Sequence, residues 1–181
     1  MAFSYKLIID SREKQVDHIT SKFLSNRILY DVRGLPIGDY RIQSDTYSPP
    51  VVIERKGSLD ELIGNLLDKD KDNEGNNRFM REILRASKTV PKTKVILLIE
   101  DKDYYEKLLK GDYRSEVHPN AIRGMIMSLE AKYPNLSIAA IDKKYSASYI
   151  HTTLYYHLRQ QLKEGDNNEQ GNNNKIEWRI N

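Results

Sequence analysis

Three acidic residues stand where the sequence predicts strands to begin or end. Asp10 follows an apolar run, Asp39 opens an extended stretch, and Glu54 follows a β-branched run. Lys56 lies two residues after Glu54, so both side chains point to the same face of an extended strand. Two or three converging carboxylates are enough to hold Mg²⁺, because its other ligands are commonly waters and phosphate oxygens. A cation held in this way polarises a phosphodiester, and a nearby lysine orients water or neutralises charge.

Each of these positions also has an ordinary structural explanation. Aspartate is a favoured N-cap, so Asp10 is equally compatible with capping the helix that follows it. Asp39 after a glycine is typical of turns, and the run from Glu54 to Lys56 is typical of a solvated charge cluster at a strand end. Asp60 falls in the first turn of a predicted helix, where the helix dipole stabilises an acid by about 0.3–1 kcal/mol whatever its function. Taken singly, these residues leave the choice between chemistry and structure open.

The elements that must position these residues begin with a strand and a helix. Residues 5–9 form a short apolar run that predicts a strand. The helix that follows is predicted from apolar residues recurring on one face, which are Val16, Ile19, Phe23 and Leu24.

Three extended stretches come next, near residues 28–33, 39–43 and 50–55. Glycine and proline separate them, and these residues break helices and set turns. The order predicts a small antiparallel meander. Its third stretch is β-branched throughout, which favours a strand buried on both faces.

The next helix is predicted from Ser58-Leu59-Asp60-Glu61, which matches the capping box. The later predicted elements are a helix over 77–88, a strand over 94–99, a helix over 103–109, a helix opening at Pro119, a strand over 136–141 and a helix over 146–163. The buried stripe predicted for the helix at Pro119 is Ala121, Ile122, Met125, Ile126 and Leu129.

Strands interleaved with helices predict an α/β fold with a central mixed sheet flanked by helices. Gly165 is predicted to end the last helix, and the Asn-rich residues 165–181 are predicted to be a polar tail without fixed structure. We therefore expect one domain over residues 1–164, followed by that tail.

Composition excludes several classes of protein. The 181 residues suit one ordinary domain, and 29 basic against 26 acidic residues leave a net charge of +3, too small to indicate nucleic acid by itself. The longest aliphatic run, residues 95–99, is far below the roughly 20 residues of a membrane span, so no membrane association is expected. The first residues do not predict a secretion signal.

The absence of cysteine and of a phosphate loop limits the kinds of cofactor that the sequence predicts. Without cysteine no thiolate metal site exists, so any metal is held by oxygen or imidazole, and a reducing, cytoplasmic location is expected. No glycine-rich loop precedes a lysine, so no nucleotide cofactor is expected.

Three short motifs in a set order carry a resemblance to a known family. They are Ile9-Asp10-Ser11-Arg12-Glu13, Gly38-Asp39-Tyr40 and Ile53-Glu54-Arg55-Lys56, the last followed after three residues by Asp60. Together they resemble the XPF-type nuclease domain, whose hallmark is Glu-Arg-Lys, three arbitrary residues and Asp. Further along the chain, Arg78-Phe79 and the segments 97–100, 121–129 and 145–147 resemble later landmarks of that family. The resemblance therefore covers residues 5–163.

The resemblance implies a restriction-endonuclease-like fold and an Mg²⁺- or Mn²⁺-dependent endonuclease. Its expected substrate is branched DNA such as forks, flaps and junctions, in repair, recombination or replication. Asp39 and Glu54 are then the expected metal ligands, Asp10 completes the acidic cluster directly or through water, and Lys56 orients water or stabilises charge. The residues expected to support the site or contact DNA are Arg12, Glu13, Arg55, Asp60 and Arg78.

The resemblance also implies a second copy of the chain as a partner. Members of the family dimerise through the nuclease domain, so a homodimer through the helices at 119–132 and 146–163 is expected. Tyr149, Tyr155 and Tyr156 belong either to that interface or to the core. Many members carry a tandem helix-hairpin-helix module after the nuclease domain, and this chain has no room for it. A stand-alone nuclease domain is similar to the phage or prokaryotic members of the family. If the protein is viral, the expected location is the cytoplasm of the host cell.

Two other functions fit the same residues. A non-catalytic DNA-binding or scaffold subunit would partner an active nuclease, although the intact acids and lysine argue against it. A nuclease acting on RNA or on linear duplex would use the same chemistry, because backbone contacts carry no base code.

Overall fold

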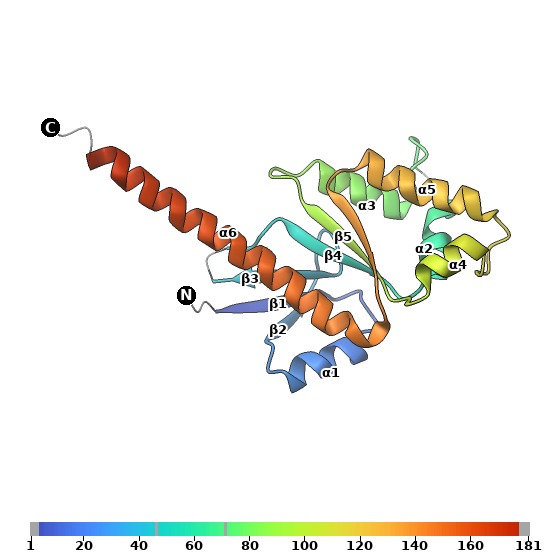
Figure 1. Cartoon of the computed structure of the whole chain (residues 1–181), viewed down its shortest axis with the longest axis horizontal. Coiled ribbons are helices and arrows are strands. Elements are labelled where there is room, and N and C mark those ends of the chain that lie inside the picture. Colours follow the sequence, from blue (N-terminus) through green and yellow to red (C-terminus); the bar gives the residue numbers. More distant parts are fainter. Residues whose placement is uncertain (1–3, 46, 71, 178–181) are drawn as a thin grey trace.

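A six-stranded mixed sheet lies at the centre of the molecule, with helices on both faces (Figure 1). The computed structural model describes residues 4–45, 47–70 and 72–177, with side chains described up to residue 164. The strands are β1 (Tyr5–Asp10), β2 (Tyr30–Arg33), β3 (Tyr40–Ser44), β4 (Val51–Lys56), β5 (Lys94–Ile99) and β6 (Leu136–Ala140). The helices are α1 (Asp17–Ser25), α2 (Leu59–Leu66), α3 (Arg78–Ser87), α4 (Tyr104–Lys110), α5 (Pro119–Lys132) and α6 (Ser146–Glu177), with a 3-10 turn η1 (Lys143–Tyr145). The predicted α/β fold with a flanked mixed sheet is confirmed.

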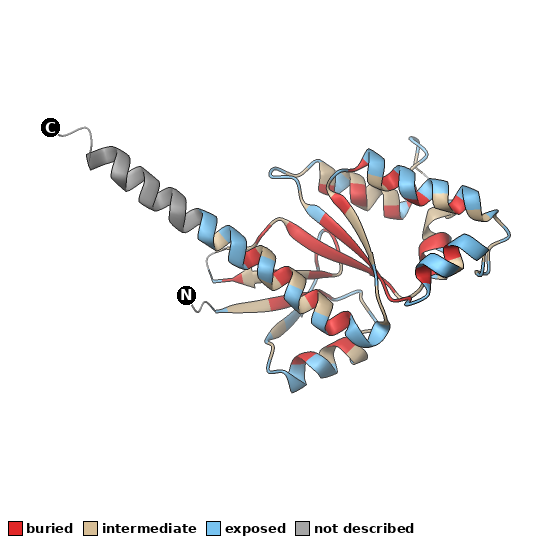
Figure 2. Ribbon diagram, in the orientation of Figure 1, coloured by how far each residue is buried: buried red, intermediate tan, exposed pale blue. Residues whose placement is uncertain are grey.

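Two hydrophobic cores lie on the two faces of the sheet. One packs α2, α3, α4 and α5 against β4 and β5, and includes Leu62, Ile83 and Ile122. The other packs α1 and α6 against the opposite face, and includes Phe23 and Leu154. Every residue of β4 is buried, as predicted, and Figure 2 shows buried residues concentrated in the central strands. The site residues on β4 therefore sit in a strand that packing holds from both sides.

The order of the strands corrects the predicted meander. The sheet runs β2-β1-β3-β4-β5-β6, so β1 lies between β2 and β3, parallel to the first and antiparallel to the second. Leu7, Ile8 and Ile9 in β1 are buried, whereas most of β2 is exposed. A strand with a buried sequence needs a neighbour on each side, and the more polar strand takes the sheet edge. Burial, rather than order along the chain, decided this pairing.

The helix after β4 begins as predicted, with one difference. The Ser58 side chain accepts a hydrogen bond from the Glu61 backbone N–H at 3.2 Å. The Glu61 carboxylate, however, accepts from the Gly57 N–H at 2.8 Å rather than from the serine amide. This contact ties the residue after Lys56 to α2 and so fixes how the chain leaves the strand.

The helical stripes are narrower than the sequence predicted. In α1, Ile19 and Phe23 are buried but Leu24 is 66% exposed. In α5, Ile122, Ile126 and Leu129 are buried. The predicted stripe members Ala121 and Met125 are exposed. An apolar residue at the margin of a stripe stays at the surface because the sheet covers only part of the helix circumference.

The last helix is longer than predicted. The backbone of α6 is helical to Glu177, so the predicted end at Gly165 is wrong. One glycine inside a helix costs about 1 kcal/mol, which is too little to stop it. Residues 178–181 lie outside the described residues, and the division into a domain and a polar tail stays a prediction.

The sequence alone does not decide whether the tyrosines of α6 belong to the core or to an interface. Tyr149 and Tyr155 pack half-buried against the second core, whereas Tyr156 is 56% exposed. In the part of the chain that is described, no helix combines the length and the apolar character needed to cross a membrane.

Candidate active site

Asp39 is carried by a tight turn that ends at the centre of the sheet. Gly38 has a φ of +73°, and a Cβ built on it would lie 2.7 Å from the Cβ of Val52. The Asp39 N–H donates to the Ile53 carbonyl at 2.8 Å, and the Asp39 carbonyl accepts from the Asp10 N–H at 2.8 Å. The turn therefore requires glycine and places Asp39 between β1 and β4.

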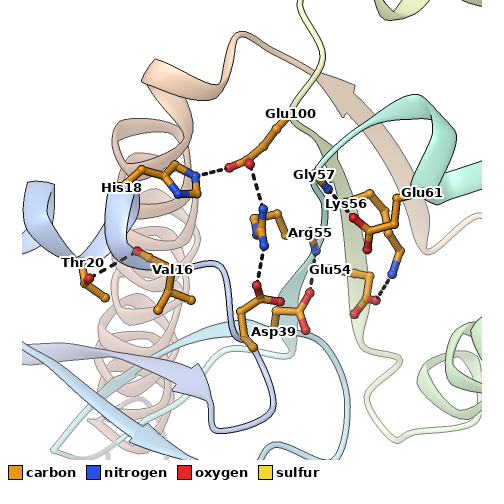
Figure 3. Close-up of polar contacts among 11 residues, drawn as sticks. Val16, His18, Thr20, Asp39, Glu54, Arg55, Lys56, Gly57, Glu61 and Glu100 are labelled. Carbon is orange, nitrogen blue, oxygen red and sulfur yellow. Dashed lines mark hydrogen bonds and ion pairs between the residues drawn. The ribbon is translucent and has the colours of Figure 1, made fainter.

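Glu54 and Lys56 project from one face of β4, and the Arg55 side chain projects from the other (Figure 3). The strand alternation predicted this shared face for the two residues. The Lys56 ammonium donates to Glu54 Oε1 at 2.7 Å, and both side chains are nearly buried. Lys56 Nζ also lies 5.3 Å from the centroid of the Phe79 ring on α3. The ammonium is thus held by a carboxylate and by an aromatic face.

The carboxyl groups of Asp39 and Glu54 influence each other. Asp39 Oδ2 accepts from the Arg55 N–H at 2.7 Å. Burial, reinforced by the charge of Glu54, raises the pKa of Asp39 to about 8. Burial also raises the pKa of Glu54, against the opposing charge of Lys56. For Lys56, burial disfavours the ammonium, but Glu54 and Asp39 outweigh it and raise the pKa. Two acids that resist ionising together form a pocket suited to a cation.

These three side chains open into one cleft of about 610 Å³. The ends of β1 and β4 form its floor, and α2 and α3 contribute its walls. Its lining includes five arginines, which are Arg12, Arg55, Arg78, Arg81 and Arg85. A floor of carboxylates under guanidinium groups combines sites for a cation and for phosphate.

A sequence model of the ERCC4 domain family matches residues 9–153, and this span contains all of the cleft described above. The chain belongs to the ERCC4 domain family. It is a nuclease of the XPF family acting on DNA, with the restriction-endonuclease-like fold of ERCC4 domains. Comparison with individual curated proteins gives no match.

Asp10, the first acid of the ERCC4 motifs, lines the cleft but is already engaged. Its carboxylate accepts from the Arg12 N–H, Nε and Nη2 at 2.8, 2.7 and 3.0 Å, and from the Leu35 N–H at 2.6 Å. Burial works to raise the pKa of Asp10, but these bonds outweigh it and lower the pKa. Asp10 does not cap α1, whose N-cap is Val16. The structure therefore joins Asp10 to Arg12, and a role in metal binding stays a prediction.

The middle residue of the Glu-Arg-Lys hallmark anchors a charge network behind the sheet. Arg55 Nη1 donates to Glu100 Oε2 at 2.8 Å, and Arg55 Nη2 donates to Glu13. His18 Nε2 lies 2.7 Å from Glu100 Oε1 (Figure 3). Arg55 lines the cleft but is only 5% exposed, and its ion pairs support the site, whereas its contact with DNA stays a prediction.

Asp60, the last residue of the hallmark, lies outside the cleft. Its Oδ1 accepts from the Arg114 N–H at 2.8 Å, so it holds the segment before α5. Arg78 is exposed and does line the cleft, as expected for a DNA-contacting residue, although that contact stays a prediction.

Sequence reasoning missed several residues of the site. His18 and Glu100 were not assigned to it, and neither were Arg81, Glu82 and Arg85 on α3. A signal existed for the arginines, because Arg81 and Arg85 follow Arg78 at helical spacing. Only the parallel pairing of β4 with β5, which sets Lys56 opposite Ile99, brings Glu100 beside the motif.

The donor set fits a hard divalent cation that shares its shell with water and substrate. Within the described residues, no three His, Cys, Asp or Glu side chains are placed to hold a metal by themselves. Asp39 and Glu54 each keep one carboxylate oxygen without a hydrogen bond from the described residues. Mg²⁺ is commonly bound by one or two carboxylates plus waters and phosphate oxygens, so two acids suffice.

Proposed function

We propose that this nuclease is an Mg²⁺- or Mn²⁺-dependent endonuclease that hydrolyses phosphodiester bonds in branched DNA. The observation that carries the proposal is the convergence of Asp39, Glu54 and Lys56 in one arginine-lined cleft. Membership of the ERCC4 family supports DNA as the substrate, and the resemblance to XPF-type nucleases supports forks, flaps and junctions.

The residues of the cleft would have different roles. Asp39 and Glu54 would hold the cation, which when bound polarises the phosphate and acidifies water. Lys56, kept in place by Glu54 and the Phe79 ring, would stabilise negative charge that develops on the phosphate oxygens. Arg12, fixed by Asp10, would bind the substrate backbone at the rim.

Cleavage of a substrate panel tests the proposal. Labelled fork, flap, Holliday-junction, linear-duplex and RNA substrates are incubated with Mg²⁺, Mn²⁺ or EDTA. We expect cation-dependent cleavage that is fastest on a branched DNA and is lost in Glu54→Ala and Lys56→Ala. Arg123→Ala on α5 is the control, because Arg123 does not line the cleft. Activity that persists in both site variants rejects the assignment.

The same panel separates the alternatives. Preferred cleavage of RNA or of linear duplex would replace branched DNA as the substrate. A scaffold subunit would cleave nothing, and calorimetric titration with Mn²⁺ would show no site that disappears in Asp39→Ala.

We further propose that the protein forms a homodimer through α5 and α6 and acts in the cytoplasm. The two helices pack on opposite faces of the sheet, α5 against the edge strand β6 and α6 against β3 and β4. Met125 and Met127 on α5 and Tyr156 on α6 are exposed apolar residues on these helices. Light scattering coupled to gel filtration should give twice the mass of 21.1 kDa, and Met127→Glu should lower it to one chain.

A further inference from the structure

Helix α3 presents a row of arginines to the cleft. Arg78, Arg81 and Arg85 follow each other at spacings of three and four residues, so they share one side of the helix. Phe79 and Ile83 on the other side are buried in the core. All three arginines line the cleft that contains Asp39 and Glu54, and the core fixes the helix that carries them.

Two of these guanidinium groups are anchored by neutral backbone oxygens. Arg81 Nη1 donates to the Asn76 carbonyl at 3.0 Å, and Arg85 Nη1 donates to the Pro36 carbonyl at 2.9 Å. A carbonyl positions a guanidinium group without cancelling its charge. The side chains are therefore ordered before any ligand arrives, which lowers the entropy lost on binding.

Neither Arg81 nor Arg85 has a close carboxylate partner among the described residues. The ion-pair contact of Arg81 is with Asp70 at 4.0 Å, and the Asp70 side chain is 83% exposed. Arg85 makes no ion pair with any residue in the described ranges. Glu82, the acid between them, is turned toward the turn before Asp39 and accepts from the Gly38 N–H at 2.7 Å. Ordered guanidinium groups without a close carboxylate partner suit a polyanion.

We propose that Arg81 and Arg85 form a phosphate track, which binds the backbone of the DNA strand that is led to Asp39 and Glu54. This inference rests on the proposed function. The two arginines are one helical turn apart, about 6 Å along α3, so they contact different phosphates of one strand. The carbonyl that anchors Arg85 belongs to Pro36, three residues before Asp39, so the track and the acidic site share one loop.

Salt-dependent DNA binding tests the phosphate track. The binding of a fluorescein-labelled fork is measured by anisotropy in EDTA, over a series of salt concentrations. Each phosphate contact contributes about 0.9 to the slope of log K against log salt, so Arg81→Ala and Arg85→Ala should each lower the slope by about that amount, and the double variant by about twice it. With Mg²⁺ or Mn²⁺, KM should rise while kcat changes little, because binding rather than chemistry is weakened.

Matched variants make the outcomes distinct. Arg81→Lys and Arg85→Lys keep the charge and should keep the slope, whereas Arg123→Ala outside the cleft should leave both slope and KM unchanged. Melting temperatures report whether the alanine variants fold. A double alanine variant that folds and keeps the wild-type slope overturns the track while the proposed function stands, and so does an equal loss in Arg123→Ala. Wild-type protein that neither binds nor cleaves DNA overturns the proposed function itself.

Discussion

At the scale of single residues, the site is a set of charges that depend on one another. The charge of Glu54 adds to the cost of ionising the buried Asp39, and Lys56 is held between Glu54 and an aromatic ring. Such an arrangement is poor for stability and good for binding a cation, because the folded chain keeps two acids together where water is largely excluded.

Asp39→Asn should raise stability in metal-free buffer at pH 8. The pKa of Asp39 is raised from an ordinary 3.8 to about 8, so between these values the folded state keeps a proton that the unfolded state has released. This contribution is fully present below pH 4 and is lost as the pH rises through 8. Asparagine carries no such charge, so the gain in melting temperature should be largest at pH 8 and vanish near pH 4.

Melting curves in EDTA from pH 4 to 8 check this. Asp142→Asn is the control, because the hydrogen bonds that the Asp142 carboxylate accepts from Lys144 lower the pKa of Asp142, so its removal gives no such gain. If the melting temperatures of wild type and Asp39→Asn differ by the same amount at every pH, the prediction is wrong.

Phe79→Leu should slow catalysis without weakening substrate binding. The ring lies over the Lys56 ammonium, and a cation–π contact is worth about 1 kcal/mol, which corresponds to about a fivefold fall in kcat. Steady-state kinetics should show KM unchanged, and Phe79→Tyr, which keeps the ring, should keep kcat. Equal rates for the leucine and tyrosine variants would show that the ring does not position Lys56.

At the scale of elements, a turn and a charge network hold together the strands that form the cleft. Three hydrogen bonds fix the turn before β3. The Gly38 N–H donates to Glu82 and the Leu35 N–H donates to Asp10. The Pro36 carbonyl accepts from Arg85. Behind the sheet, Arg55 and Glu100 join β4 to the segment after β5, and His18 adds α1. The acids are thereby positioned from both faces of the sheet.

Gly38→Ala should destabilise the protein and abolish cleavage. The residue needs a positive φ, and its Cβ would lie 2.7 Å from that of Val52, so a cost of about 1–3 kcal/mol is expected in urea unfolding. Gly34→Ala is the matched control, because no atom lies within 4 Å of its Cβ. If both variants unfold at the same urea concentration, the turn does not need glycine.

His18→Leu should destabilise the network that supports Arg55. The Glu100 carboxylate is buried and would lose one of its two partners, at a cost of about 1–3 kcal/mol. His18→Gln can still donate a hydrogen bond and should recover most of that loss in urea unfolding. A leucine variant as stable as wild type would show that His18 contributes nothing to the network.

At the scale of the whole molecule, the cleft and the second hydrophobic core lie on different faces of the sheet. The face with α2–α5 carries the cleft, and the face with α1 and α6 carries the second core. The Arg55 network connects the two, because Arg55 and Glu13 also line the cleft and His18 lies on α1. The net charge of +3 does not reveal the cleft, because the acids and arginines of the cleft cancel in the sum.

Mg²⁺ should stabilise the folded molecule through the acidic site. A ligand at a hundred times its dissociation constant adds about 2.7 kcal/mol when it binds only the folded state. The melting temperature of the wild type at pH 8 should therefore rise with the Mg²⁺ concentration. This rise should disappear in Asp39→Asn and Glu54→Gln. The control Asp142→Asn should keep it. A rise of the same size in the site variants would place the cation elsewhere.

Local patterns in the sequence determined the elements and the motif order. The β-branched run predicted the buried β4, the serine at 58 predicted the start of α2, and the spacing of Glu54 and Lys56 predicted their shared face. These features depend on backbone geometry within a few residues. What only the tertiary structure decided are contacts between distant segments: β1 between β2 and β3, Asp10 bonded to Leu35, and Asp60 bonded to Arg114 outside the cleft. Strand pairing and core packing set those neighbours, and they depend on the burial of the whole chain rather than on any local pattern.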